Sequence, residues 1–473
     1  MPDLSLCYLS AVELARMIRE RQVSARDVME AHLAQIEKLN PKLNAVVTLA
    51  AEEALEEAGR ADDDLARGEP RGVLHGLPVG IKDLDLTAGM RTTFGSPIHK
   101  DFVPERDELI VERYRAAGAI VVGKTNTPEF GAGSQTFNEV FGETLNPYDL
   151  GKTCGGSSGG SAVALAARML PLASGGDLGG SLRNPGNFCN IVGFRPSPGR
   201  VPTWPTLQGW WTLSVKGPLA RTVEEVALQL TALAGPDDRS PISIREPGKM
   251  FARPLGRDFK GTRVAWSRDL GRYPVEPEVN AVIDGRRSLF QELGCEIHDD
   301  HPDFRDADEI FQVLRAHSYA ARFDETLKKH RKLLKDTVIW NIERGLGQDG
   351  PTVARAEVAR TALFHRVREF FQNYAFLVLP VSPVPPFPIE QRYITEINGQ
   401  KLESYIDWMA LCYAITITGH PAVSVPCGFT SGGLPVGVQI VGRCNGDFEL
   451  LQFAYAFEQA TRCVDTLPAL AAL

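Results

Sequence analysis

The sequence predicts an α/β fold in one domain, and three observations support this class. Short apolar runs typical of buried strands alternate with segments of helical periodicity along the chain. The 473 residues are 43% hydrophobic and 23% charged, which is ordinary for a protein that buries a large core. Strand patterns lie on both sides of the most proline-rich stretch, PVSPVPPFP, so we expect that stretch to be an excursion from the domain and not a linker.

The first elements that we expect are helices between about residues 5 and 60. Ser10 and Ser24 each precede an acidic residue by three positions, which is the spacing of a capping box. Apolar residues then recur at helical spacing as far as Leu39, and Pro41 is expected to end this helix. The first residues lack the basic start and long apolar core of an export signal, which favours a cytoplasmic protein.

A strand is expected next, because Leu77, Val79 and Ile81 alternate with small residues and end at Lys82. Later elements follow from the same signals. They are a helix over 107–117, a strand within 118–125, a helix over 161–168, a helix after Thr222, a strand over 263–266, helices over 277–293 and 351–374, and strands in FLVL, HPAVSVP and GVQIVG.

Two glycine clusters stand out between residues 151 and 218. One is CGGSSGGS, which contains Ser157 and Ser158, and the other is GGDLGGS, which ends at Ser181. Glycine at this density marks backbone that approaches a ligand closely or adopts positive φ. A phosphate-binding loop is disfavoured, since GGSSGG fits neither nucleotide-binding pattern. We interpret Ser158 and Ser161 as loop and helix-start hydroxyls.

Several blocks together resemble the amidase signature family, in particular its free-standing bacterial amidases. The resemblance extends from about Leu9 to Ala460 and implies one compact α/β domain with a large mixed sheet flanked by helices, and no metal or cofactor. We therefore expect residues 1–473 to form one domain, with variable excursions at about 236–260 and 305–405. The blocks are GIKD, GGSSGGSAVALAA, GGDLGGSLRNP, GFRPSPGRVP, GPLARTVEEVA, GHPAVSVPCGF and GLPVGVQIVG.

The resemblance implies a catalytic triad in which Ser181 is the nucleophile, Ser157 is a bridge and Lys82 is the base. It also implies a cis peptide bond between Gly156 and Ser157. A lysine acts as a base only as the neutral amine, so burial without a compensating carboxylate must lower its pKa. Asp83 is therefore expected to point away from Lys82.

The loop before Ser181 is predicted to stabilise the oxyanion of the tetrahedral intermediate through backbone N–H groups. Asp177 and Arg183 flank this loop, and we expect them to support it as an ion pair or a hydrogen-bonded frame. The predicted donors are the N–H groups of Leu178, Gly179, Gly180 and Ser181.

Substrate contacts are predicted in segments that vary within the family, at Gly131, Gly133, Trp210 and Trp211. The tryptophans favour an apolar site that accepts aryl or alkyl amides. The family also accepts carbamates (urethanes), oligoamides and esters. We therefore expect a small amide, carbamate or ester as the substrate.

Other functions stay open at this stage. The chain could instead serve as the A subunit of a glutamine amidotransferase within a tRNA complex, although GGDLGGSLRNP looks more like a free-standing amidase. A non-catalytic binding protein is a further alternative. A Ser-His-Asp triad is disfavoured, because no buried strand precedes the GxSxG letters. The formal charge of -8 argues against a nucleic-acid ligand, no membrane partner is expected, and a homodimer is compatible with the sequence.

Overall fold

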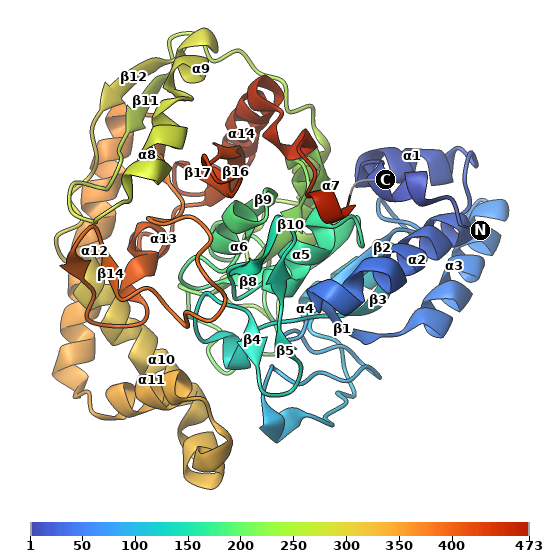
Figure 1. Ribbon diagram of the computed structural model, residues 1–473, viewed down its shortest axis with the longest axis horizontal. Coiled ribbons are helices and arrows are strands. Elements are labelled where there is room, and N and C mark those ends of the chain that lie inside the picture. Colours follow the sequence, from blue (N-terminus) through green and yellow to red (C-terminus); the bar gives the residue numbers. More distant parts are fainter. Residues whose placement is uncertain (1, 472–473) are drawn as a thin grey trace.

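A mixed sheet of eleven strands runs through the computed structural model, which describes residues 2–471 (Figure 1). The strands in spatial order are β1 (Val46–Leu49), β3 (Ile120–Thr125), β2 (Pro78–Lys82), β8 (Leu172–Asp177), β10 (Val215–Ala220), β9 (Val192–Arg195), β16 (Ala422–Phe429), β17 (Pro435–Val441), β13 (Phe376–Pro380), β11 (Arg263–Trp266) and β12 (Glu296–Asp299). Strands β3, β2 and β8 are parallel, as are β13, β11 and β12. The strands between these two groups pair antiparallel.

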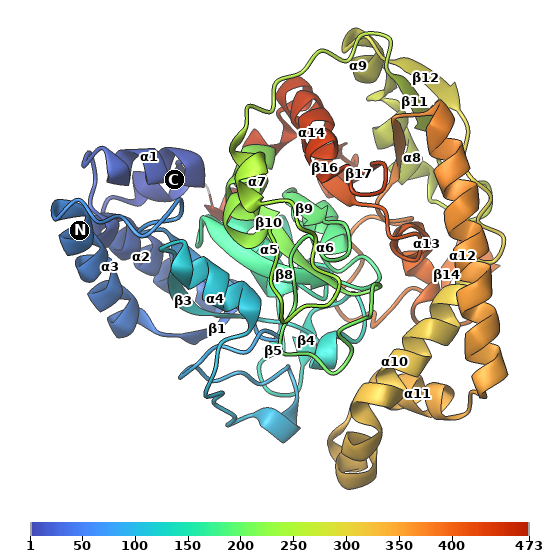
Figure 2. The same ribbon diagram turned by 180° about the vertical axis from the view of Figure 1, so that it is seen from behind.

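Helices flank this sheet (Figure 2). They are α1 (Ala11–Arg19), α2 (Ala25–Leu43), α3 (Ala51–Ala66), α4 (Leu109–Ala116), α5 (Gly159–Ala166), α6 (Arg183–Phe188), α7 (Val223–Leu233), α8 (Pro277–Asp284), α9 (Arg287–Glu292), α10 (Ala307–His330), α11 (Asp336–Leu346), α12 (Gly350–Asn373), α13 (Ala410–Thr416) and α14 (Asp447–Thr461). No helix of residues 2–471 is both long and apolar enough to cross a membrane.

Short elements complete the architecture. Three two-stranded hairpins are β4 (Phe137–Asn138) with β5 (Gly142–Glu143), β6 (Leu145–Asn146) with β7 (Asp149–Thr153), and β14 (Glu396–Ile397) with β15 (Gln400–Lys401). Single 3₁₀ turns are Leu4–Tyr8, Pro97–His99, Glu129–Gly131, Gly248–Ala252, Arg331–Leu333, Asp407–Met409, Cys463–Asp465 and Ala469–Ala471.

The predicted α/β class is confirmed, and helices α1, α2 and α7 begin directly after the expected capping residues Ser10, Ser24 and Thr222. Ser24 and Thr222 each form a reciprocal capping box at the start of α2 and α7. The expected end of α2 at Pro41 is wrong. The helix continues for two residues to Leu43, because proline removes only one hydrogen bond in the last turn, and Asn44 then caps it with left-handed backbone at φ 51°.

Two further boundaries differ from the prediction. The segment 277–293 forms two helices, α8 and α9, which Gly285 and Arg286 separate. Helix α5 begins at Gly159, so Ser161 lies inside the helix and its hydroxyl donates to the Ser174 carbonyl at 2.8 Å. A buried glycine-rich helix start has no exposed capping residue that would mark it in the sequence.

One main hydrophobic core extends from Leu6 to Ala471 and includes residues of α1, α2 and α3, so the N-terminal helices pack on the sheet. The stretch 305–405 is not a single excursion, because it contains β13, which pairs with β11 and β17. Within this stretch α10 and α11 form a hairpin that extends away from the sheet (Figure 1). A second, smaller apolar cluster joins this hairpin to Phe130 and Ala132.

Candidate active site

Three segments converge at one edge of the sheet. Strand β2 ends at Lys82, and the neighbouring parallel strand β8 ends at Asp177, so the loops after both strands leave from the same edge. The loop before α5 brings Ser157 and Ser158 to this point, and the peptide bond from Gly156 to Ser157 is cis, as expected.

The amine of Lys82 is buried and bonded to two hydroxyls. Its Nζ donates to Ser157 Oγ at 2.7 Å and to Ser158 Oγ at 2.9 Å. Burial lowers the pKa of this amine to about 7, with the charge of Lys216 adding to the effect and that of Asp85 opposing it. Ser158 lies at the start of α5, as expected, but its hydroxyl contacts Lys82 and does not cap the helix.

No carboxylate of residues 2–471 forms an ion pair with the Lys82 amine. As expected, Asp83 points elsewhere, and its carboxylate accepts hydrogen bonds from the N–H and the hydroxyl of Thr93. Asp85 accepts from Ser174 Oγ at 2.8 Å and pairs with Lys216. Lys216 also pairs with Glu108 at 2.8 Å. These three charged residues were missed in the sequence, since each lies in a different segment and no local motif joins them.

Ser181 lies half-buried in the loop between β8 and α6, at the wall of the same cavity as Lys82 and Ser157. Its carbonyl accepts from the Ser158 N–H at 3.3 Å, which places the two glycine-rich loops side by side. The hydroxyl of Ser181 forms no hydrogen bond to another group of residues 2–471. It is therefore free to meet a ligand in the cavity.

The four predicted oxyanion donors are not equivalent. Leu178, Gly179 and Ser181 line the cavity. Gly180 does not, and its N–H donates to Asp177 Oδ1 at 2.9 Å, so this donor is already used. Gly180 has φ 116°, and a Cβ added there would lie 2.7 Å from the Cβ of Cys412, which explains why this position requires glycine.

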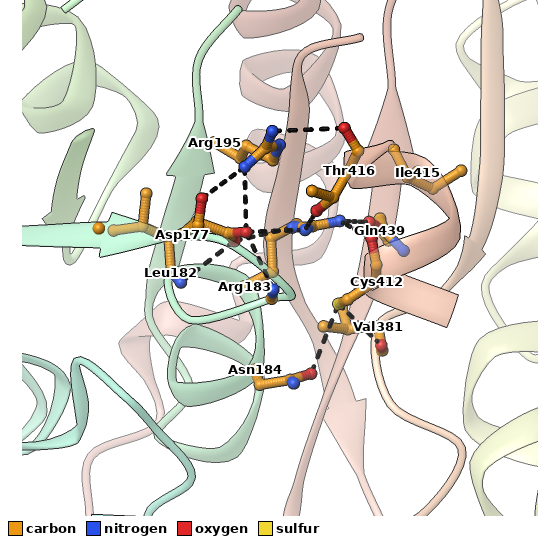
Figure 3. A network of polar contacts seen from close by, with 12 residues as sticks. Asp177, Leu182, Arg183, Asn184, Arg195, Val381, Cys412, Ile415, Thr416 and Gln439 are labelled. Atoms are coloured by element: carbon orange, nitrogen blue, oxygen red, sulfur yellow. Dashed lines mark hydrogen bonds and ion pairs between the residues drawn. The ribbon is translucent and has the colours of Figure 1, made fainter. Parts of the chain in front are cut away.

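The loop is fixed by a buried charge network (Figure 3). Arg183 donates to both carboxylate oxygens of Asp177, at 3.0 and 2.9 Å, so the expected ion pair is present. Arg195 also bonds the backbone carbonyl of Asp177, at 2.6 Å. Burial opposes the charge of Asp177, but the two guanidinium groups hold the pKa of this carboxyl well below its ordinary value. Arg183 further bonds Gln439 and Thr416, and so ties the loop to β17 and α13.

The site opens into a cavity of about 650 Å³. Gly131, Gly133 and Trp211 line it, and a Cβ on Gly131 would lie 3.4 Å from Ser157 Oγ. The predicted substrate contact of Trp210 is wrong, because its side chain is 78% exposed and lies outside the cavity wall. Trp210 and Trp211 are adjacent in a turn, so one ring packs inward when the other faces solvent.

Aromatic residues outside the predicted set form much of the cavity wall. Helix α10 contributes Phe311, Tyr319 and Phe323, and Phe94 and Phe130 come from loops. The α10 residues recur at helical spacing, a pattern that also fits burial in the core, so the sequence alone does not mark them as ligand contacts. Among the histidines of residues 2–471, only His99 lines the cavity, and its imidazole packs on Phe94, Phe102 and Phe130 without a hydrogen bond to a serine side chain of these residues.

Known proteins of similar sequence and structure match nearly the whole chain. The family profile described as Amidase matches residues 27–451. An acylamidase of Rhodococcus erythropolis is 34% identical over 99% of both chains, and the A subunit of the glutamyl-tRNA(Gln) amidotransferase of Alkaliphilus metalliredigens is 33% identical over 97% of this chain and 98% of its own. The crystal structure of a bacterial aryl acylamidase of the amidase signature enzymes superposes with TM-score 0.91 and 29% identity, covering 97% of this chain and 98% of that one. This chain belongs to the amidase signature family.

Proposed function

We propose that this chain is a serine amidohydrolase that cleaves small, largely apolar amides with Ser181 as nucleophile, Ser157 as relay and Lys82 as base. The observation that carries the proposal is the pairing of a buried amine with the Ser157 hydroxyl at 2.7 Å, without a carboxylate partner, beside a cavity that Ser181 also lines. A buried lysine of this kind is suited to accept a proton and not to bind an anion.

The reaction would proceed through an acyl-enzyme. Ser181 Oγ attacks the acyl carbon while its proton passes to Ser157 and the Ser157 proton passes to Lys82. The C–N bond then breaks, and the proton returns through Ser157 to the departing amine. Water attacks the Ser181 ester, which releases the carboxylic acid and restores the hydroxyl. Because a hydroxyl both donates and accepts, Ser157 can carry a proton in either direction.

The developing oxyanion would be bound by the free N–H groups of the loop. Leu178, Gly179 and Ser181 supply these donors, since Gly180 already donates to Asp177. The ion pairs of Asp177 hold the donors before substrate arrives, and a preorganised donor stabilises the transition state more than one that must reorient. The loss of one such donor typically costs about 3 kcal/mol of transition-state stabilisation.

The cavity supports aryl and alkyl amides as substrates. Its volume of about 650 Å³ and its aromatic wall suit a small apolar ligand. The relatives named acylamidase and aryl acylamidase support the same class. Carbamates, oligoamides and esters have an acyl carbon of similar shape, so we include them as substrates to be ranked by experiment.

A second candidate function is that of one component of a glutamine amidotransferase. One observation favours it: the chain is 33% identical, over nearly its whole length, to the A subunit of such an enzyme. A component of this kind would depend on partner proteins. A free-standing amidase would act alone, in the cytoplasm, on a small molecule and without nucleic acid. A non-catalytic binding protein would bind amides without turning them over.

The test is hydrolysis of a panel by the purified chain alone: an aryl acetamide, a benzamide, an aryl carbamate, a linear amide oligomer and glutamine. We expect turnover of an aryl amide, and a loss of at least about 10³-fold in kcat for Ser181→Ala and Lys82→Ala. If glutamine were the only panel member hydrolysed, the result would favour the amidotransferase function. Binding of panel members without turnover would favour the non-catalytic alternative and contradict the proposal.

A further inference from the structure

The charges that line the cavity do not balance. Its carboxylates are already paired, since Asp85 and Glu108 share Lys216, and Asp177 lies between two arginines. Apart from Lys82, whose pKa burial lowers to about 7, two cations of the wall have no such partner among residues 2–471. Arg315 and Arg322, both on α10, form no ion pair with a carboxylate of residues 2–471.

Arg315 is the inner of these two cations and is only 4% exposed. Its guanidinium donates to the hydroxyl of Tyr405 at 2.7 Å and to the side-chain oxygen of Asn341, and it lies over the ring of Tyr319 at 4.7 Å. All these partners are neutral, so they orient the guanidinium without cancelling its charge. A buried cation without a counter-ion is unfavourable, which indicates that an anion from outside the chain completes the site.

The rise along helix α10 gives the approximate distance of that anion from the loop before Ser181. The ring of Phe311 packs against the loop before Ser181, because a Cβ on Gly179 would lie 3.0 Å from Phe311 Cζ. Arg315 follows Phe311 by four residues on the same helix, which is about 6 Å along the axis. Arg322 lies about 16 Å beyond Phe311 by the same measure and is exposed, so it marks the mouth of the cavity.

We propose that Arg315 binds a carboxylate carried by the substrate, so that the preferred substrates are amides with an acidic group a few bonds from the scissile C–N bond. The planar guanidinium matches a carboxylate with two parallel hydrogen bonds. Arg322 at the mouth would attract the same anion during entry. The inference rests on the proposed function, because it names the substrate class of that site.

The acidic group could belong to the acyl part or to the amine part, and two matched pairs of probes separate these sources. The acyl pair is the mono-4-nitroanilide of glutaric acid and the 4-nitroanilide of 5-methylhexanoic acid, in which two methyl groups replace the carboxylate oxygens. The amine pair is 4-(acetylamino)benzoate and 4-isopropylacetanilide. Each neutral compound has nearly the shape of its acid.

The experiment measures Kd for the four probes by calorimetry, with Ser181→Ala protein so that no probe is consumed. We expect one acid to bind more tightly than its neutral partner, and Arg315→Gln in the same background to reduce that preference at least about tenfold. Arg315→Lys keeps the charge and should reduce it less. Arg331→Gln is the matched control, because Arg331 pairs with Glu343 on the surface of the same hairpin.

The inference is overturned if neither acid binds more tightly than its neutral partner. This comparison needs only the Ser181→Ala protein, so it can be made even if Arg315→Gln fails to fold. It is also overturned if Arg315→Gln weakens both members of a pair equally, since that result indicates a structural role. Turnover of the two neutral anilides by the wild type tests the proposed function separately. A protein that hydrolyses them without preferring an acid keeps the proposed function and loses this inference.

Discussion

The amine of Lys82 owes its chemistry to its surroundings. An ordinary lysine is protonated at neutral pH, but this one is buried against two hydroxyls and has lost most of its hydration. The two acidic residues that follow Lys82 in the chain are engaged elsewhere, Asp83 with Thr93 and Asp85 with Lys216. Burial therefore lowers the pKa of this amine, against the opposing charge of Asp85 and with the charge of Lys216 adding to the effect.

The pH dependence of kcat/KM tests this account of the base. Since burial lowers the pKa of Lys82 to about 7 and only the neutral amine accepts a proton, activity should rise with pH and level off above about 7. The profile of an aryl acetamide between pH 5 and 9 measures this limb. A maximum on the acid side, followed by a fall through neutrality, would contradict a lysine base.

The adjacent serines offer a matched comparison at the same amine. Both hydroxyls bond Lys82, but only Ser157 lines the cavity. We expect Ser157→Ala to lower kcat by about 10² to 10⁴-fold, the usual contribution of a positioned proton carrier. Ser158→Ala should lower it by about tenfold or less, the cost of one orienting hydrogen bond. Steady-state kinetics of both variants measure these losses, and a larger loss of kcat in Ser158→Ala than in Ser157→Ala would contradict the assignment of Ser157 as the proton relay.

How far the sequence predicts single residues depends on whether they lie in a local pattern. Lys82, Ser157 and Ser181 each occupy a recognisable block, and the structure brings all three to one cavity. Lys216 and Arg315 act through contacts with distant segments, so nothing in their neighbours identifies them. The sequence placed both Trp210 and Trp211 at the substrate, whereas the geometry of one turn separates their faces.

At the scale of elements, the site depends on how three of them meet. Asp177 ends β8, Arg183 begins α6 and Arg195 ends β9, and their charges join at one point beneath the loop that carries Ser181 (Figure 3). Leu182 anchors one end of the loop in the main core, but Gly179 and Gly180 have no side chains that could hold the backbone between. The ion pairs therefore fix its backbone.

Asp177→Asn should destabilise the fold. The substitution leaves Arg183 and Arg195 buried without their shared counter-ion, so we expect a loss of about 3 to 5 kcal/mol in the free energy of unfolding. Urea denaturation measures it. Glu343→Gln, which removes an exposed ion pair with Arg331, should cost no more than about 1 kcal/mol. Equal losses in the two variants would argue against a role for the buried network.

Elements were predictable where a cap or an alternating run marks them, as at Ser24, Thr222 and the strand that ends in Lys82. The helix pair α10 and α11 was not foreseen, although α10 lines the cavity. Its apolar positions are shared between the small cluster around Phe130 and the cavity wall, so no single stripe stands out among many charged residues. The division between α8 and α9 depends on Gly285, which a helix also tolerates.

For the whole molecule, the main core and the eleven-stranded sheet place the two glycine-rich loops on a rigid frame. Strands of the first half of the chain form one side of that sheet and strands of the second half form the other, and the two sides join where β9 pairs with β16. The similarity to an acylamidase and to the A subunit of an amidotransferase extends over nearly the full length of this chain. The fold is therefore common to relatives with different names, and differences in substrate must come from the residues that line the cavity.

The most direct test of the central claim is a search for the acyl-enzyme on the chain alone. The purified protein is mixed with an aryl amide and quenched with acid during turnover. It is then digested, and the masses of the peptides are measured by mass spectrometry. We predict an added acyl mass on the peptide that contains Ser181, absent from Ser181→Ala and strongly reduced in Lys82→Ala. An acyl group on another residue, or turnover that persists in Ser181→Ala, would contradict the assignment of Ser181 as the nucleophile.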